Sequence, residues 1–265
     1  MAERHLEEAD VAAAWNRNAD RWSRSVRAGH DRYRELYTLP AFLAFMPGIE
    51  GLRVIDLGCG EGANTRRFAR LGGRMTGIDL ASAMISRARA EEAREPLGIR
   101  YEIASFSRID CCAAESFDCV LSTMALMDGP DFGGAMREAY RLLVPGGRLC
   151  FSILHPCFIT PTVAWLRAED GRYSGLKVGR YFDSAHFVEH WRFGKHEVSR
   201  ALEPFEVPRF PRTLADIVND VCRAGFRITE IDEPRPDQAP AEEHPWLARW
   251  REHAPLVLLF SAVKA

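Results

Sequence analysis

The feature that most constrains the fold is a short apolar strand that leads into closely spaced glycines and then into a helix. Residues 53–57 read Arg-Val-Ile-Asp-Leu, which predicts a buried strand, and residues 58–62 read Gly-Cys-Gly-Glu-Gly. A helix is predicted over residues 64–71. Glycine adopts backbone conformations that other residues avoid, so this turn lets the backbone pass close to a ligand. Several nucleotide-binding α/β folds share such a turn.

Strands and helices alternate along most of the chain, which predicts a doubly wound α/β fold around a mostly parallel sheet. The predicted strands cover residues 53–57, 75–78, 99–103, 117–122, 148–154, 226–231 and 256–263. The predicted helices cover residues 9–26, 32–45, 64–71, 83–93, 132–143 and 213–224.

The alternation stops after residue 154 and resumes at residue 213. The intervening stretch is rich in aromatic residues, histidine and arginine and has no regular hydrophobic period. It is too long for a simple loop in a compact domain, so we expect it to cover the active site. The chain thus divides into a helical cap (1–48), an α/β core (49–155 and 213–265) and an inserted substrate cover (156–212).

Composition argues against nucleic acid and membranes as partners. The 35 Lys and Arg residues nearly balance the 37 Asp and Glu residues, so no bulk charge attracts the chain to phosphates. The first residues are charged and carry no apolar signal region, and the apolar run near residues 256–260 is too short to span a bilayer. These features predict a cytoplasmic protein.

The seven cysteines predict neither disulfides nor a metal site. Cys111 and Cys112 are adjacent, a geometry that rarely closes a disulfide, and no pair has the C-x-x-C spacing of structural zinc sites. Free cysteine usually packs as a small hydrophobic residue, so we expect reduced and mostly buried thiols.

Two carboxylates next to the glycine turn indicate the charge of the ligand. Asp56 precedes the first glycine by two positions, where a pyrophosphate would meet repulsion on the order of 4 kcal/mol at an effective dielectric of 20. An ammonium or sulfonium group would instead be attracted, directly or through water. Asp79 ends the second predicted strand, where a carboxylate can accept hydrogen bonds from both hydroxyls of a ribose. Together the two acids favour S-adenosylmethionine as cofactor.

These segments resemble the class I S-adenosylmethionine-dependent methyltransferases, and within them a bacterial branch that acts on small molecules. The resemblance rests on residues 15–19, 54–62, 77–84, 116–122, 143–147 and 155–158. It implies a Rossmann-like seven-stranded sheet of order 3-2-1-4-5-7-6, with the last strand, residues 256–263, antiparallel beside the fifth.

The resemblance also implies roles for individual residues. Gly58, Cys59 and Gly60 would line the methionine end of the cofactor, and Asp79 would hold its ribose. The remaining positions would enclose the adenine, border the sulfonium or close over the cofactor: Leu80, Met84, Ser105, Phe106, Thr123, Met124 and Trp15.

The sequence departs from the family at the adenine position. The family usually has an aspartate after the third strand, but this chain has Ala104-Ser105-Phe106. Ser105 would then have to make the hydrogen bond to the adenine. We also expect an arginine such as Arg24 or Arg32 to meet the cofactor carboxylate.

The acceptor should bind beyond the carboxyl ends of the strands, where the cover begins. His155 follows the fifth strand, and His155 and His190 are the candidate catalytic residues because imidazole titrates near neutrality. Alternatively, His155 caps the strand or bonds a backbone carbonyl. Aromatic residues of the cover, such as Trp191, would suit an aromatic acceptor, and Arg209 an anionic one.

Methyl transfer from a sulfonium is an in-line displacement, so positioning and desolvation can supply most of the acceleration without a strong base. The sequence therefore predicts methyl transfer to an oxygen, nitrogen or carbon atom of a small molecule, and a homodimer is compatible with it. Two alternatives remain at this point. Residues 58–63 also fit the G-x-G-x-x-A pattern of NAD-dependent oxidoreductases, and a protein could bind the cofactor without catalysis.

Overall fold

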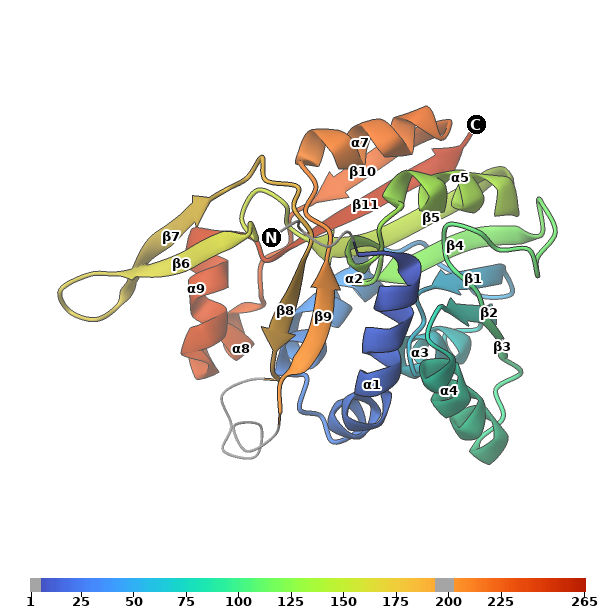
Figure 1. Ribbon diagram of the computed structural model, residues 1–265, viewed down its shortest axis with the longest axis horizontal. Helices are drawn as coiled ribbons and strands as arrows, with labels where there is room; N and C mark the ends of the chain where they lie inside the picture. Colours follow the sequence, from blue (N-terminus) through green and yellow to red (C-terminus); the bar gives the residue numbers. More distant parts are fainter. Residues whose placement is uncertain (1–5, 194–202) are drawn as a thin grey trace.

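The structure, a computed structural model, describes residues 6–193 and 203–265 and is built on a seven-stranded sheet (Figure 1). Its strand order is β10-β11-β5-β4-β1-β2-β3. The strands are β1 (Arg53–Leu57), β2 (Arg74–Asp79), β3 (Arg100–Ile103), β4 (Phe117–Thr123), β5 (Leu143–Leu154), β10 (Phe226–Asp232) and β11 (Val257–Lys264).

The sheet has the predicted topology. Strands β1 to β5 pair in parallel, while β11 pairs antiparallel with both β5 and β10. The predicted order 3-2-1-4-5-7-6 is therefore confirmed. All five parallel strands end at the same edge of the sheet, and it is there that residues following β1, β2, β3 and β4 can meet around one ligand.

Helices cover both faces of the sheet (Figure 1). Strand β1 shows how: Val54 packs in a cluster with residues of α2, α3 and α4, whereas Ile55 packs in a cluster with residues of α5 and α7. The α-helices are α1 (Glu8–Arg27), α2 (Leu39–Phe45), α3 (Ala63–Arg70), α4 (Ser82–Arg94), α5 (Phe132–Leu142), α7 (Leu214–Arg223), α8 (Gln238–Glu243) and α9 (Pro245–His253). A short 3-10 helix, η2 (Leu126–Asp128), follows β4.

The predicted second helix, 32–45, contains a π-helical segment. Its first part, η1 (Arg34–Thr38), runs without a break into α2. Pro40 lies within the first turn of α2, where it lacks an N–H donor and its ring displaces the preceding carbonyl. A local widening to a π-helix accommodates such a residue.

The predicted cover contains two β-hairpins that its sequence did not reveal. One pairs β6 (Thr162–Arg167) with β7 (Tyr173–Gly179), and the other pairs β8 (Phe187–Trp191) with β9 (Phe205–Arg209). The sequence showed no regular hydrophobic period in this stretch and therefore did not predict these strands. Most positions of β6 are exposed or half-buried, so no apolar alternation marks it as a strand.

The first helix connects the core to the second hairpin. The side-chain oxygen Oδ1 of Asn16 accepts a hydrogen bond of 2.8 Å from the N–H of Ala83, in the first turn of α4. No side chain at the N-cap of α4 performs this role. Asn18, which is buried, donates from Nδ2 to the backbone oxygen of Glu206 on β9 at 2.8 Å. Helix α1 therefore lies between α4 and β9, as Figure 1 shows.

Residues 145–147 form an irregularity inside β5, where the register shifts relative to β4. The expectation of mostly buried thiols needs correction. The cysteines are free thiols, but only Cys59, Cys119 and Cys150 are buried, while Cys111 and Cys222 are exposed.

Within residues 6–193 and 203–265, no helix is long and apolar enough to cross a membrane, and no cluster of three candidate metal ligands occurs.

Gly77→Ala tests how closely β2 packs beneath the site. A Cβ atom at Gly77 would lie 2.8 Å from Cδ1 and 2.9 Å from Cε1 of the Tyr101 ring, and 3.0 Å from Sγ of Cys59. We expect G77A to lower the free energy of unfolding by about 1–3 kcal/mol in urea titrations, because a close-packed core cannot absorb the methyl group. Gly48→Ala is the control, since nothing lies within 4 Å of its Cβ position. Equal stabilities of the two variants would contradict this packing.

Candidate functional site

The turn after β1 requires glycine for steric reasons. Gly58, Gly60 and Gly62 have φ angles of 74°, 56° and 87°, in the left-handed region that L-residues with side chains disfavour. A Cβ atom at Gly58 would also lie 2.3 Å from the Cβ of Ala125. The chain can therefore turn from β1 into α3 while the loop after β4 approaches it.

The amides of this turn bond to the protein itself. The N–H groups of Gly58 and Cys59 both donate to the backbone oxygen of Ile78 at 2.9 Å. The N–H of Gly60 donates to Oδ2 of Asp79, also at 2.9 Å. A pyrophosphate needs such N–H groups as donors. These three N–H groups are therefore not available to a pyrophosphate, which disfavours the NAD alternative.

Asp79 connects three parts of the site. Besides the N–H of Gly60, its carboxylate accepts the N–H of Ala81 at 2.8 Å through Oδ1. Burial raises the pKa of Asp79 to about 6, while these two hydrogen bonds act in the opposite direction. At neutral pH the carboxylate is ionised and lies in the wall of a cavity, where hydroxyl groups of a ligand can donate to it.

Asp56 lies beneath the turn and is fully buried. Its Oδ2 accepts a hydrogen bond of 2.6 Å from Oγ1 of Thr65, whereas Oδ1 has no partner among the described residues. Burial raises the pKa of Asp56 to about 7. Asp56 is not part of the cavity wall. Asp56 would therefore interact with a ligand across the turn or through a water molecule, not by direct contact.

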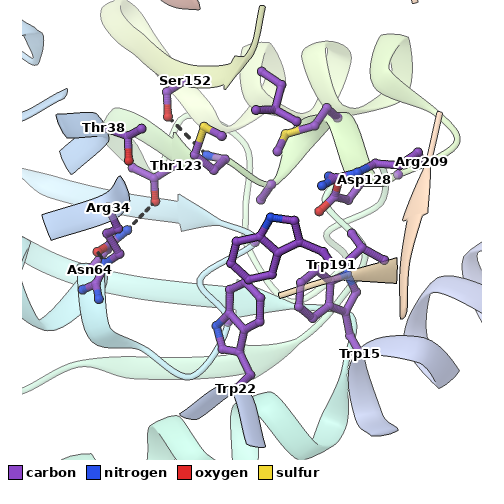
Figure 2. A pocket seen from close by; sticks show the side chains of 18 of the residues that line it. Trp15, Trp22, Arg34, Thr38, Asn64, Thr123, Asp128, Ser152, Trp191 and Arg209 are labelled. Atoms are coloured by element: carbon purple, nitrogen blue, oxygen red, sulfur yellow. Dashed lines mark hydrogen bonds and ion pairs between the residues drawn. The ribbon is translucent and has the colours of Figure 1, made fainter. Parts of the chain in front are cut away.

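A cavity of about 460 Å³ lies over the carboxyl ends of the strands. It extends from α1 and the turn after β1 to the loops after β4 and β5 and to the hairpin β8–β9. Figure 2 shows part of it. Every residue predicted to bind the cofactor except Asp56 lines this cavity: Trp15, Gly58, Cys59, Gly60, Asp79, Leu80, Met84, Ser105, Phe106, Thr123 and Met124.

A chain of polar side chains closes one side of the cavity (Figure 2). Nε of Arg34 donates to Oδ1 of Asn64 at 2.8 Å, and Nδ2 of Asn64 donates to Oγ1 of Thr123 at 2.8 Å. Arg34, unlike the predicted Arg24 and Arg32, thus lines the cavity close to the glycine turn. Nη2 of Arg32 instead lies 2.9 Å from Nε2 of His244.

Met124 has an unusual backbone at the end of β4. Its φ angle is 54°, which is strained for a residue with a long side chain. The N–H of Met124 donates to the backbone oxygen of Ser152 on β5 at 2.9 Å, and Oγ of Ser152 lies 3.2 Å from the same nitrogen (Figure 2). This contact holds Met124 in the cavity wall beside Thr123.

Three tryptophans form an aromatic wall at the cover end of the cavity. The rings of Trp15 and Trp22 lie 5.0 Å apart edge to face, and those of Trp22 and Trp191 lie 5.5 Å apart. Figure 2 shows the three rings gathered below Asp128 and Arg209. Flat apolar walls of this kind suit an aromatic ligand.

The charged groups at this end consist of one guanidinium between two carboxylates. Arg209 donates to Oε2 of Glu189 at 2.7 Å and to Oδ1 of Asp128. Burial raises the pKa of Asp128 to about 6, although Arg209 opposes the shift. The whole cavity wall contains more acids than bases: Glu8, Asp31, Glu61, Asp79, Asp128 and Glu189 against Arg34 and Arg209.

His155 lies outside the cavity wall, and both nitrogens of its ring contact other groups of the protein. Its Nε2 is 2.7 Å from Oε1 of Glu233, and its Nδ1 accepts the N–H of Cys157 at 3.2 Å. Burial lowers the pKa of His155 despite Glu233. A neutral ring with its proton on Nε2 satisfies both contacts. The geometry therefore favours the alternative in which His155 anchors the chain after β5.

His190 lies on the exposed side of β8. Its neighbours Glu189 and Trp191 both line the cavity. Because successive side chains of a strand point to opposite faces, His190 points away from the cavity. The structure thus places both predicted catalytic histidines outside the cavity wall, and a catalytic role for either remains a prediction without geometric support.

Sequence reasoning missed several residues of the wall, notably Glu8, Arg34, Asn64 and Asp128. Asn64 is the second residue after the glycine turn, so its position in the first turn of α3 could have identified it. The others come from segments distant in the sequence, which only the fold brings to the cavity.

Comparisons with known proteins agree with this geometry. The family described as a methyltransferase domain matches residues 55–151. Two relatives are named as ubiquinone biosynthesis O-methyltransferases. The protein from Nitrosococcus oceani is 37% identical over 107 residues, which cover 40% of this chain and 45% of that protein. The protein from Xanthomonas campestris pv. campestris strain B100 is 33% identical over 180 residues, covering 68% and 69% respectively. The matched region thus spans less than half of the length of the first relative and about two thirds of the length of the second.

A solved structure extends the similarity over most of the chain. An S-adenosylmethionine-dependent methyltransferase from Mesorhizobium loti is 31% identical, with a TM-score of 0.68. The match covers 84% of this chain and 96% of that one. The overall fold described above is therefore shared with that protein.

The buried carboxyl group of Asp56 predicts a pH-dependent stability. Its pKa is 3.8 in a solvated reference state and about 7 here, so the folded protein retains a proton that the unfolded chain has lost. The free energy of unfolding should therefore fall as pH rises through this window. Between pH 5 and pH 8 we expect wild type to lose on the order of 1 to 3 kcal/mol more than Asp56→Asn in urea titrations. The exposed substitution Asp20→Asn should follow wild type. Parallel pH profiles for wild type and D56N would refute the burial effect.

Proposed function

Because this chain belongs to the class I S-adenosylmethionine-dependent methyltransferases, we propose that it transfers a methyl group from that cofactor to a small-molecule acceptor. The observation that carries the proposal is the single cavity, which joins the glycine turn and Asp79 at one end to an aromatic wall at the other. Such a cavity can hold a cofactor and a small flat acceptor together.

The residues present fit S-adenosylmethionine. Asp79 offers a carboxylate for the ribose hydroxyls, and a Cβ position at Gly60 has nothing within 4 Å, so the turn leaves room for a ligand. The excess of carboxylates in the wall favours a cation over an anion. When bound, the cofactor supplies an activated methyl group on a positively charged sulfur.

We assign the remaining contacts by position along the cavity. Leu80 and Met84 provide apolar surface beside Asp79. We assign Arg34 to the cofactor carboxylate: its guanidinium lines the cavity, its bond to Asn64 orients it, and it shares its charge with Glu35 at 3.1 Å. Thr123 and Met124, at the end of β4, form the wall next to the reacting methyl group. These residues position the reactants and exclude water, which is the main contribution that methyl transfer requires.

The cover end of the cavity supports an aromatic acceptor that is neutral or cationic. Trp22 and Trp191 supply the flat walls, and Asp128 is a buried carboxylate that can accept a hydrogen bond from an acceptor hydroxyl or amine. Arg209 is already paired with Asp128 and Glu189, so it offers little net positive charge for an anionic acceptor. The naming of relatives as ubiquinone biosynthesis O-methyltransferases supports an oxygen atom of the acceptor as the first candidate for methylation.

The division into a cap (1–48), a core (49–155 and 213–265) and a substrate cover (156–212) fits this proposal. Helix α1 and the hairpin β8–β9 each form part of the wall around the core site, and Asn18 bonds one to the other. In this arrangement the cap and the cover together close the cavity over the reactants.

Titration with S-adenosylhomocysteine tests the cofactor site. We expect wild type to bind this product with a measurable heat in calorimetry and with a raised unfolding temperature. Asp79→Ala should weaken binding on the order of 10- to 100-fold, because hydrogen bonds to a charged group are lost. Asp20→Asn is the control. Undiminished binding by D79A would rule out the ribose role.

A panel of small phenols and aromatic amines, incubated with labelled S-adenosylmethionine, tests the transfer reaction. For an acceptor found in this way, Trp191→Ala should raise the KM on the order of 10-fold or more by removing a wall of the pocket, with little change in cofactor affinity.

His190→Ala is the matched control on the same strand and should leave the KM and kcat of wild type. A loss of kcat in H190A would instead restore the sequence-based expectation for that histidine. Firm binding of the cofactor without methyl transfer to any member of the panel would favour a non-catalytic binding protein.

A further inference from the structure

Glu8, in the first turn of α1, meets the loop that follows β3. Its Oε1 accepts hydrogen bonds from Oγ of Ser105 at 2.5 Å and from Oγ of Ser107 at 2.6 Å. Oγ of Ser105 also lies 2.8 Å from Oγ of Ser107 and accepts the N–H of Ser107 at 3.1 Å. The single hydroxyl proton of Ser105 therefore has partners within this cluster, in Glu8 and Ser107, which changes the expectation that Ser105 faces the nucleobase on its own.

The position of Glu8 along the cavity indicates which part of the cofactor it meets. The glycine turn after β1 and Asp79 at the end of β2 account for the methionine arm and the ribose. A ligand that continues in the same direction along the edge of the sheet reaches β3, because β3 pairs with β2 on the side away from β1. The wall there consists of apolar surface and one ionisable group: Leu80, Met84, Phe106 and Glu8.

Glu8 is not needed to cap its own helix. The capping box of α1 is formed by Glu7 and Asp10, and Asn16 and Asn18 already tie the helix to α4 and β9. The second oxygen, Oε2, accepts no hydrogen bond from any group in the described part of the chain. Two serine hydroxyls thus orient a carboxylate whose remaining acceptor capacity is unused.

We propose that Glu8 accepts a hydrogen bond from the 6-amino group of the cofactor's adenine, so that the N-terminal helix determines nucleobase specificity. A carboxylate accepts from an amino group and repels a carbonyl oxygen, so the site distinguishes adenine from a 6-oxopurine. Ser105 and Ser107 position Glu8 and do not themselves select the base. The proposal rests on the cofactor assignment and is independent of the identity of the acceptor.

Calorimetric affinities for two nucleosides test this role without any methyl transfer. The probes are S-adenosylhomocysteine and S-inosylhomocysteine, which differ in carrying an amino group or an oxygen at position 6 of the purine. We expect wild type to prefer the adenine compound on the order of 10- to 100-fold. Glu8→Gln should bring the ratio of the two affinities close to 1, since an amide can both donate and accept. Asp20→Asn, on the same helix and paired with Arg87, should keep the wild-type ratio.

The ratio also separates base recognition from a merely structural role. If Glu8 only docks the helix, E8Q weakens both compounds by the same factor and the wild-type ratio persists, which overturns the proposal. A wild-type protein that shows no preference between the compounds overturns it as well. Failure of wild type to bind S-adenosylhomocysteine at all would overturn the cofactor assignment together with the role of Glu8, whereas the absence of an acceptor would affect neither.

Discussion

The site depends on the carboxylate of Asp79 and its two hydrogen bonds to backbone N–H groups. Through Gly60 it holds the turn after β1, and through Ala81 it holds the chain that leads from β2 into α4. These hydrogen bonds fix two neighbouring strand ends relative to each other. They also occupy backbone N–H groups that could otherwise donate to a phosphate. Keeping a buried carboxylate ionised is costly, as its raised pKa shows, and a ligand that donates hydroxyl groups relieves part of that cost.

Helix α1 converts this open edge into an enclosed cavity. Its polar side chains reach three separate elements: Glu8 meets the loop after β3, Asn16 meets α4, and Asn18 meets β9. Its apolar face contributes Trp15 and Trp22 to the wall. Because the same helix bonds to the core and to the second hairpin, cofactor and acceptor regions share one structural support.

The charged residues of the cavity wall suit a cationic cofactor at one end and an aromatic acceptor at the other. In the wall as a whole, carboxylates outnumber guanidinium groups, which favours a cationic ligand. At the cover end, Arg209 is balanced by Asp128 and Glu189, so aromatic surface dominates there. The sequence pattern suggested a free arginine for an anionic acceptor, but the pairing that neutralises it depends on residues 81 and 20 positions away in the chain.

The sequence by itself determined the features that depend on neighbours in the chain. Strand and helix periodicity, the glycines of the turn and the placement of Asp79 at a strand end are local, and they predicted the mostly parallel α/β sheet. The strand order and most residues of the cofactor wall followed from the resemblance of these segments to the methyltransferase family. The tertiary structure alone decided which side chains meet across long separations. It brought Glu8 to Ser105, turned Trp191 rather than His190 toward the cavity, and buried His155 against Glu233. Such contacts arise from packing and strand pairing between distant segments, and no local pattern encodes them.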